Sequence, residues 1–177
     1  MYRIPVLAAV LGLCAAGCGS SSTSTTPTPT GPNNTPVFTA TMLPANEVPA
    51  IVGAEAGGSG TVTITFHLTR DSTNTLTAAT VDFVASMSGF PAGTVLTAAH
   101  IHPGAVGVNG GVLISTNIAP GTEVTMPNGS GTLDHSNNSL IPSDVQGIIN
   151  NPAGYYFNIH TPANPGGVAR GQLVAKS

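Results

Sequence analysis

The sequence has little charge of either sign. Charged residues make up 6% of its 177 positions, with four Lys or Arg against seven Asp or Glu. The basic residues are scattered along the chain at Arg3, Arg70, Arg170 and Lys176. Binding to a nucleic acid depends on clustered cations that neutralise many phosphates. The composition therefore argues against a nucleic-acid partner.

Cysteine is equally scarce. Both cysteines, Cys14 and Cys18, lie near the N-terminus. The rest of the chain must hold its fold by packing and backbone hydrogen bonds, and it has no cysteine nucleophile. It also lacks a Gly-x-Ser-x-Gly elbow, a phosphate-binding glycine loop and an assignable pair of catalytic carboxylates. The sequence gives no basis for predicting an enzyme.

The N-terminus resembles the leader of a bacterial lipoprotein. Arg3 precedes an apolar run over residues 4–13 that is too short for a stable membrane anchor. A lipobox-like run, Ala-Ala-Gly-Cys, ends at Cys18. We expect residues 1–17 to be a signal peptide and Cys18 to be lipidated. A secretory signal without lipidation is the alternative.

A tether follows over residues 18–36. It consists mainly of Gly, Ser, Thr, Pro and Asn, a composition that cannot bury enough apolar surface to fold. Such a spacer lets a domain over residues 37–177 stand off a membrane. Ser20 lies two positions after the cysteine and favours the outer membrane if the host has two. The sequence predicts an extracytoplasmic, lipid-anchored protein of the cell envelope.

Residues 37–177 have the pattern of an all-β domain. Residues 61–68 alternate strictly, which places Val62, Ile64 and Phe66 on a core face, and residues 76–85 form the return strand of a hairpin. Further strands are predicted at 37–43, 95–102, 111–117, 122–126, 129–134, 154–160 and 169–175. A short helix is predicted near 143–150, with Ser143 as its cap and Gln146 at the capping-box position. Many short strands separated by turns favour a Greek-key β-sandwich or barrel.

Three histidines fall on two of the predicted strands. His100 and His102 are two residues apart, so their side chains point to one face of their strand. If Ile101 and Ile159 face the core, His160 faces outward together with them. Three imidazoles on neighbouring strands would suit copper or zinc. The alternative is that the rings hydrogen-bond backbone carbonyls and pin the loops beside them.

Three motifs, in order, resemble the CHRD domain, which is named from chordin and also occurs in bacterial secreted proteins. They lie at Ala45–Pro49, at Ala99–His102 and along the C-terminal stretch Tyr156–Leu173. The resemblance covers roughly residues 38–175. At Val168-Ala169 the chain departs from the family, which commonly carries an acidic and an aliphatic residue there.

The resemblance implies mainly a fold, an immunoglobulin-like β-barrel distantly similar to copper/zinc superoxide dismutase. By that analogy His100 and His102 would be copper ligands, His160 would be a third, and Arg170 would guide an anion. Similarity of fold does not transfer activity, and we do not expect dismutase activity.

Arg170 also has a structural interpretation. Its guanidinium could lock the C-terminal strand by binding loop carbonyls or a carboxylate such as Glu47. Pro49, Asn158 and Gly171 are motif residues for which we expect structural roles.

Two functions therefore stay open. The first is a non-enzymatic domain, displayed at the cell envelope, that binds a protein or a polysaccharide. The second is a copper- or zinc-binding protein with a redox-protective role.

Overall fold

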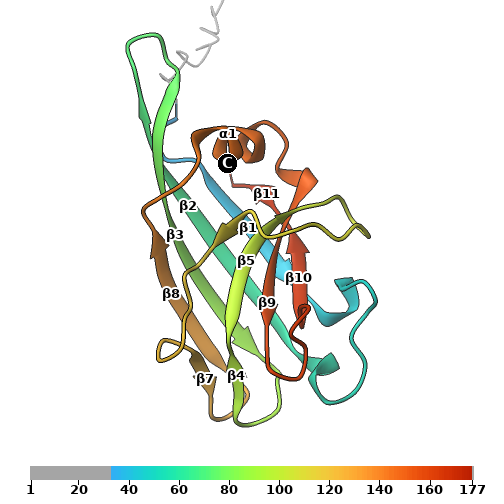
Figure 1. The fold of residues 1–177 in the computed structure, drawn as a ribbon. Coiled ribbons are helices and arrows are strands. Elements are labelled where there is room, and N and C mark those ends of the chain that lie inside the picture. The colour runs from blue at the N-terminus through green and yellow to red at the C-terminus, as the bar shows by residue number, and fades with distance from the viewer. Residues whose placement is uncertain (1–32, 177) are drawn as a thin grey trace, which may run out of the picture. The chain divides into compact units, whose positions relative to one another are not determined.

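The computed structural model describes residues 33–176 (Figure 1). The signal peptide expected at 1–17, the acceptor Cys18 and most of the tether expected at 18–36 lie outside the described residues. Within them, no helix is long and apolar enough to cross a membrane.

Residues 33–176 form strands, one α-helix and three 3₁₀ turns. The strands are β1 (Val37–Met42), β2 (Ser59–Arg70), β3 (Leu76–Ser88), β4 (Thr94–Leu96), β5 (Ala98–Pro103), β6 (Ile114–Ser115), β7 (Val124–Met126), β8 (Gly131–Asn137), β9 (Tyr155–His160), β10 (Ala169–Gln172) and β11 (Val174–Ala175). The helices are α1 (Pro142–Asn150), η1 (Pro44–Asn46), η2 (Ala54–Gly57) and η3 (Pro152–Gly154).

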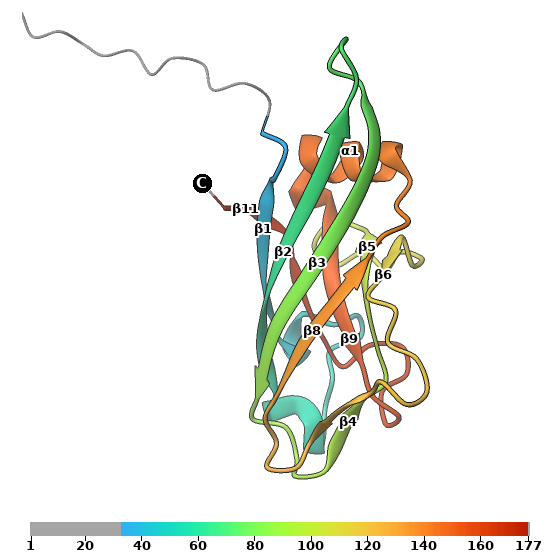
Figure 2. The same cartoon turned by 90° about the vertical axis from the view of Figure 1, so that its left-hand side faces the viewer.

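The strands build a β-sandwich, which confirms the predicted fold class. One sheet has the order β11-β1-β2-β3-β8 and the other β10-β9-β5-β6, while β4 and β7 form a small separate pair. Figure 2 shows β1, β2, β3 and β8 side by side in front of β5 and β9. Neighbouring strands in these sheets run antiparallel, as expected of hairpins and Greek-key connections.

The core lies between the two sheets. Val62, Ile64 and Phe66 of β2 are almost fully buried, as their alternation predicted. Phe83 of β3 packs against Phe157 of β9, with ring centroids 5.7 Å apart. These two rings come from opposite sheets, so the aromatic contact joins the two layers.

Two predicted strands are divided in the structure. The strand predicted at 95–102 is split at Thr97, whose amide donates to the carbonyl of His160, and β4 then pairs with β7 while β5 pairs with β9. The strand predicted at 169–175 is split at the buried Leu173, and β11 crosses to pair with β1. Alternation alone does not reveal a change of sheet, because both halves keep the pattern of a strand.

The predicted helix is confirmed as α1, but its cap is not the expected one. The helix begins at Pro142, its N-cap residue is Ile141, and no side chain caps it. Ser143 is therefore inside the first turn. Proline suits that turn because its φ is already helical and its missing N–H is not needed there.

The outer face of the second sheet is covered rather than open. The loop after β5 is held against η3, β10 and β9. The amide of Gly104 donates to the carbonyl of Gly154, its carbonyl accepts a bond from Gln172, and the amide of Gly110 donates to the hydroxyl of Tyr156. The segment after β9 turns back over the same strand (Figure 1). As a result, Tyr156 and Asn158 of β9 are buried although they point away from the core. The candidate site lies under this cover.

Candidate metal centre

Strands β5 and β9 bring the three predicted histidines together. His100 and His102 lie two residues apart on β5, and His160 on β9 is paired with Ala98, two residues before His100. One nitrogen of each ring lies within 4.8 Å of the corresponding nitrogens of the other two. We call these three residues the histidine triad. Such proximity is necessary for three rings to share a metal ion.

Backbone carbonyls orient two of the rings. Nδ1 of His102 donates to the carbonyl of Gly110 at 3.1 Å, and Nδ1 of His160 donates to the carbonyl of Pro165 at 3.0 Å. Each ring therefore keeps an unprotonated Nε2. Nδ1 of His100 then donates to Nε2 of His160 at 3.1 Å. Carbonyl bonds of this kind fix the tautomer and orientation of histidine ligands in metal sites.

Nε2 of His102 is buried and has no hydrogen-bond partner among residues 33–176. Buried polar atoms in native proteins are nearly always paired with protein, water or an ion. This nitrogen is therefore an acceptor that no donor of the described residues reaches.

Burial lowers the pKa of all three imidazoles. The pKa of His100 falls to about 4, first through burial and then through the neighbouring His160 and His102. Burial also lowers the pKa values of His102 and His160, although their carbonyl bonds act in the opposite direction. The rings are uncharged at neutral pH, which is the form that binds a metal.

The histidines do not face solvent as the alternation predicted. His102 and His160 are 5% and 7% exposed, and His100 is half-buried. The face of the strand was predicted, but the loops that cover it could not be. Such cover lowers the local dielectric and limits access of water to the triad.

Glu55 supports His160 and was not singled out from the sequence. This buried carboxylate of η2 accepts hydrogen bonds from the hydroxyl of Thr161 at 2.8 Å and from the amide of Asn164 at 2.5 Å. These bonds hold the turn that presents the carbonyl of Pro165 to His160. Glu55 lies more than a hundred residues from its partners, so local spacing has no signal for the contact.

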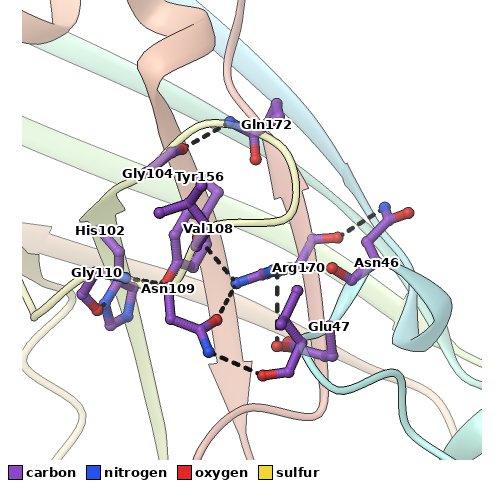
Figure 3. Close-up of polar contacts among 11 residues, drawn as sticks. Asn46, Glu47, His102, Gly104, Val108, Asn109, Gly110, Tyr156, Arg170 and Gln172 are labelled. Carbon is purple, nitrogen blue, oxygen red and sulfur yellow. Dashed lines mark hydrogen bonds and ion pairs between the residues drawn. The ribbon is translucent and has the colours of Figure 1, made fainter.

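Arg170 is buried and separated from the triad by a tyrosine. Its Nε donates to the carbonyl of Asn46 at 2.7 Å and its Nη1 to Oδ1 of Asn109 at 2.7 Å. The guanidinium lies 4.6 Å from the centre of the Tyr156 ring, whose other side stacks on His102 (Figure 3). These contacts fasten β10 to η1 and to the loop after β5. Contacts of this kind are what the structural interpretation of Arg170 predicted.

Glu47 lies beside Arg170, as the same interpretation supposed. Its Oε2 is 3.9 Å from Nε of Arg170, and both side chains are buried. Burial raises the pKa of Glu47 to about 7, while the positive charge of Arg170 lowers it. At 3.9 Å the two groups form an ion pair without a hydrogen bond, so the carboxylate is only partly compensated.

The other motif residues occupy distinct places. Pro49 follows the cis Val48–Pro49 peptide on an exposed loop. A Cβ at Gly171 would collide with the carbonyl oxygen of Thr41 on β1, so only glycine allows this approach of β10 to β1. Asn158 is buried, and its Oδ1 has no hydrogen-bond partner within the described part of the chain.

Comparison with known proteins identifies one family. The profile of the CHRD domain matches residues 38–173, which include both strands that carry the triad. No match was found among curated proteins or among solved structures.

Proposed function

We start from the fact that the chain belongs to the CHRD domain family, which points to a binding or structural domain, and we propose that this domain binds a copper or zinc ion. The proposed ligand atoms are Nδ1 of His100 and Nε2 of His102 and His160. The convergence of three imidazoles, one of which has a buried Nε2 with no partner among the described residues, carries this proposal. Neutral imidazoles suit both metals, and copper is favoured by the general order of affinities.

The triad would have to contract to accept an ion. Metal–imidazole bonds of roughly 2.0–2.1 Å place two ligand nitrogens of a tetrahedral site roughly 3.4 Å apart, whereas the three nitrogens are separated by as much as 4.8 Å. His100 and His160 already approach to 3.1 Å through a hydrogen bond. The ion would take the place of the proton on Nδ1 of His100, and that proton would move to Nε2 of the same ring. Three protein ligands leave a fourth position for water or a small ligand.

Metal analysis of the untagged protein tests this function. We expect one copper or zinc ion per chain in a titration, and loss of that binding in the variants His102→Ala and His160→Ala. His67→Ala is the matched control, because His67 is exposed and bonds Asp82 on the other sheet. Equal stoichiometry in wild type and both triad variants would refute the proposal. The binding role of the domain would then fall to a protein or polysaccharide ligand.

We further propose that the domain is displayed from a membrane of the cell envelope through lipid on Cys18. The support is in the sequence: the leader of residues 1–17, the lipobox-like run ending at Cys18 and the tether of residues 18–36. Acyl chains on the mature N-terminal cysteine would contribute ~0.8 kcal/mol for each buried CH₂. In a two-membrane host, Ser20 favours the outer membrane.

Fractionation of cells that express two cysteine variants tests the anchor. Cys18→Ala should shift the protein from the membrane to the soluble fraction, whereas Cys14→Ala should stay with the membrane. Continued membrane retention of Cys18→Ala would contradict the anchor without affecting the metal proposal.

A further inference from the structure

We propose that Tyr156 is the positioning residue of the His102 ligand: its ring packs on the imidazole while its hydroxyl holds the residue that sets the tautomer. This inference rests on the proposed metal site. Tyr156 is paired with His102 in the β5–β9 register, so the two side chains stand next to each other on the covered face of the sheet.

Two contacts link Tyr156 to His102. The rings are parallel within 6°, with centroids 5.0 Å apart. The tyrosine hydroxyl also accepts the amide proton of Gly110 at 3.2 Å, and the carbonyl of the same Gly110 accepts the bond from Nδ1 of His102. One side chain therefore fixes both the plane of the imidazole and the acceptor that keeps its proton on Nδ1 (Figure 3). Nε2 is left free for the ion.

Gly110 can fill this role because it lies very close to β5. A Cβ at this position would collide with the carbonyl oxygen of Pro103. Its neighbour Asn109 is tied on two sides, because Oδ1 accepts from Arg170 and Nδ2 donates to the carbonyl of Val48 at 2.9 Å. The loop is thus held at Asn109 and at the Tyr156 hydroxyl, and the carbonyl of Gly110 has a defined position.

Arg170 packs on the face of the Tyr156 ring opposite His102. Its guanidinium lies over the face of Tyr156 that is turned away from His102. The phenol is therefore confined between a cation and an imidazole, which limits its rotation. The positive charge of Arg170 also lowers the pKa of His102, adding to the larger effect of burial, and so favours the neutral ring.

The variant Tyr156→Phe distinguishes the contribution of the hydroxyl from that of the aromatic ring. It keeps the stacking surface and removes only the acceptor for the amide of Gly110. Tyr155→Phe is the matched control: it makes the same chemical change one residue earlier, where the hydroxyl lies against Gly147 of α1. Both variants are compared with wild type as the full chain, after circular dichroism shows that the fold is retained.

Two readouts are needed. The first is the tautomer of His102 in the metal-free protein, read from the ¹⁵N chemical shifts of its ring. The second is copper affinity, measured by competition with a chelator. We expect Tyr156→Phe to lose the single Nδ1-protonated tautomer and to bind copper at least tenfold more weakly, in the range usual for outer-shell partners of metal ligands. Tyr155→Phe should match wild type in both readouts.

The outcomes separate the two proposals. If wild type binds copper and Tyr156→Phe keeps both its tautomer and its affinity, the positioning role is refuted while the metal site stands. If wild type binds no metal, the proposed function fails, and the tautomer readout still decides whether Tyr156 orients His102. A change of equal size in Tyr155→Phe would show a general effect of losing a phenol, and would also overturn the inference.

Discussion

His100 makes the stability of the metal-free protein depend on pH in a direction that the structure defines. Burial, with the nearby His160 and His102, lowers its pKa from 6.5 to about 4 on folding. A group whose pKa is depressed in the folded state contributes stability that is present above its unfolded pKa and is lost as the pH falls toward the folded value. The relevant window is therefore pH 6.5 to 4.

The size of the effect follows from these two pKa values. Between pH 7 and 5.5 the unfolded chain takes up roughly two-thirds of a proton at His100, while the folded protein takes up almost none. The free energy of unfolding should fall by about 1 kcal/mol over this interval, after allowance for solvent screening of a half-buried ring. Glu47 acts in the opposite direction, because its folded pKa of about 7 lies above 4.5. Its contribution is present below pH 4.5 and is lost as the pH rises through 7.

Comparison with the variant His100→Gln isolates the histidine from Glu47, since both proteins keep the carboxylate. Urea unfolding at pH 7.0 and 5.5, with a chelator present, gives the free energy of unfolding of each protein. Wild type should lose about 1 kcal/mol more than the variant between the two pH values. Equal losses would refute the reasoning, because they would mean that folding does not shift the pKa of His100.

Two pairs of substitutions test the packing. Gly171→Ala should destabilise the domain by roughly 2–4 kcal/mol, because the new methyl meets the carbonyl of Thr41. Gly166→Ala, where nothing lies near the added Cβ, should change stability much less. Phe157→Ala should cost about 3–5 kcal/mol by leaving a cavity between the sheets, against less than about 0.5 kcal/mol for Val52→Ala at an exposed position. Thermal or urea unfolding checks all four, and equal losses within either pair would contradict the packing described.

The sheets could be predicted because a local pattern decides them. The alternation that includes Val62, Ile64 and Phe66 determines which side of β2 faces the core, whatever lies opposite. The His100–His102 spacing likewise determines that both rings share a face, since the side-chain period of a strand is two. Whether His160 joins them depends on which strands pair, and the period of the pattern does not determine the pairing.

The rest of the site could not be predicted because distant segments build it. The loop after β5 and the turn after β9 cover the triad. The alternation of residues along a strand does not determine the path of a loop. Glu55 and the Gly110–Tyr156 contact join positions far apart in the sequence. Glu55 also gave no signal because an isolated carboxylate resembles any surface residue until its partners are known.

The last described residue, Lys176, lies beside the start of β1. The amide of Lys176 donates to the carbonyl of Val37 at 2.8 Å, and β11 runs alongside the start of β1. A peptide linker from Lys176 to residue 33 would close the described residues into a ring and keep the bonds that the carbonyls of Asn34 and Pro36 accept from β2. New ends could be opened in the exposed turn between β2 and β3. A fluorescent reporter attached after Lys176 would be placed beside the strand where the domain starts, at the opposite end of β1 from η1.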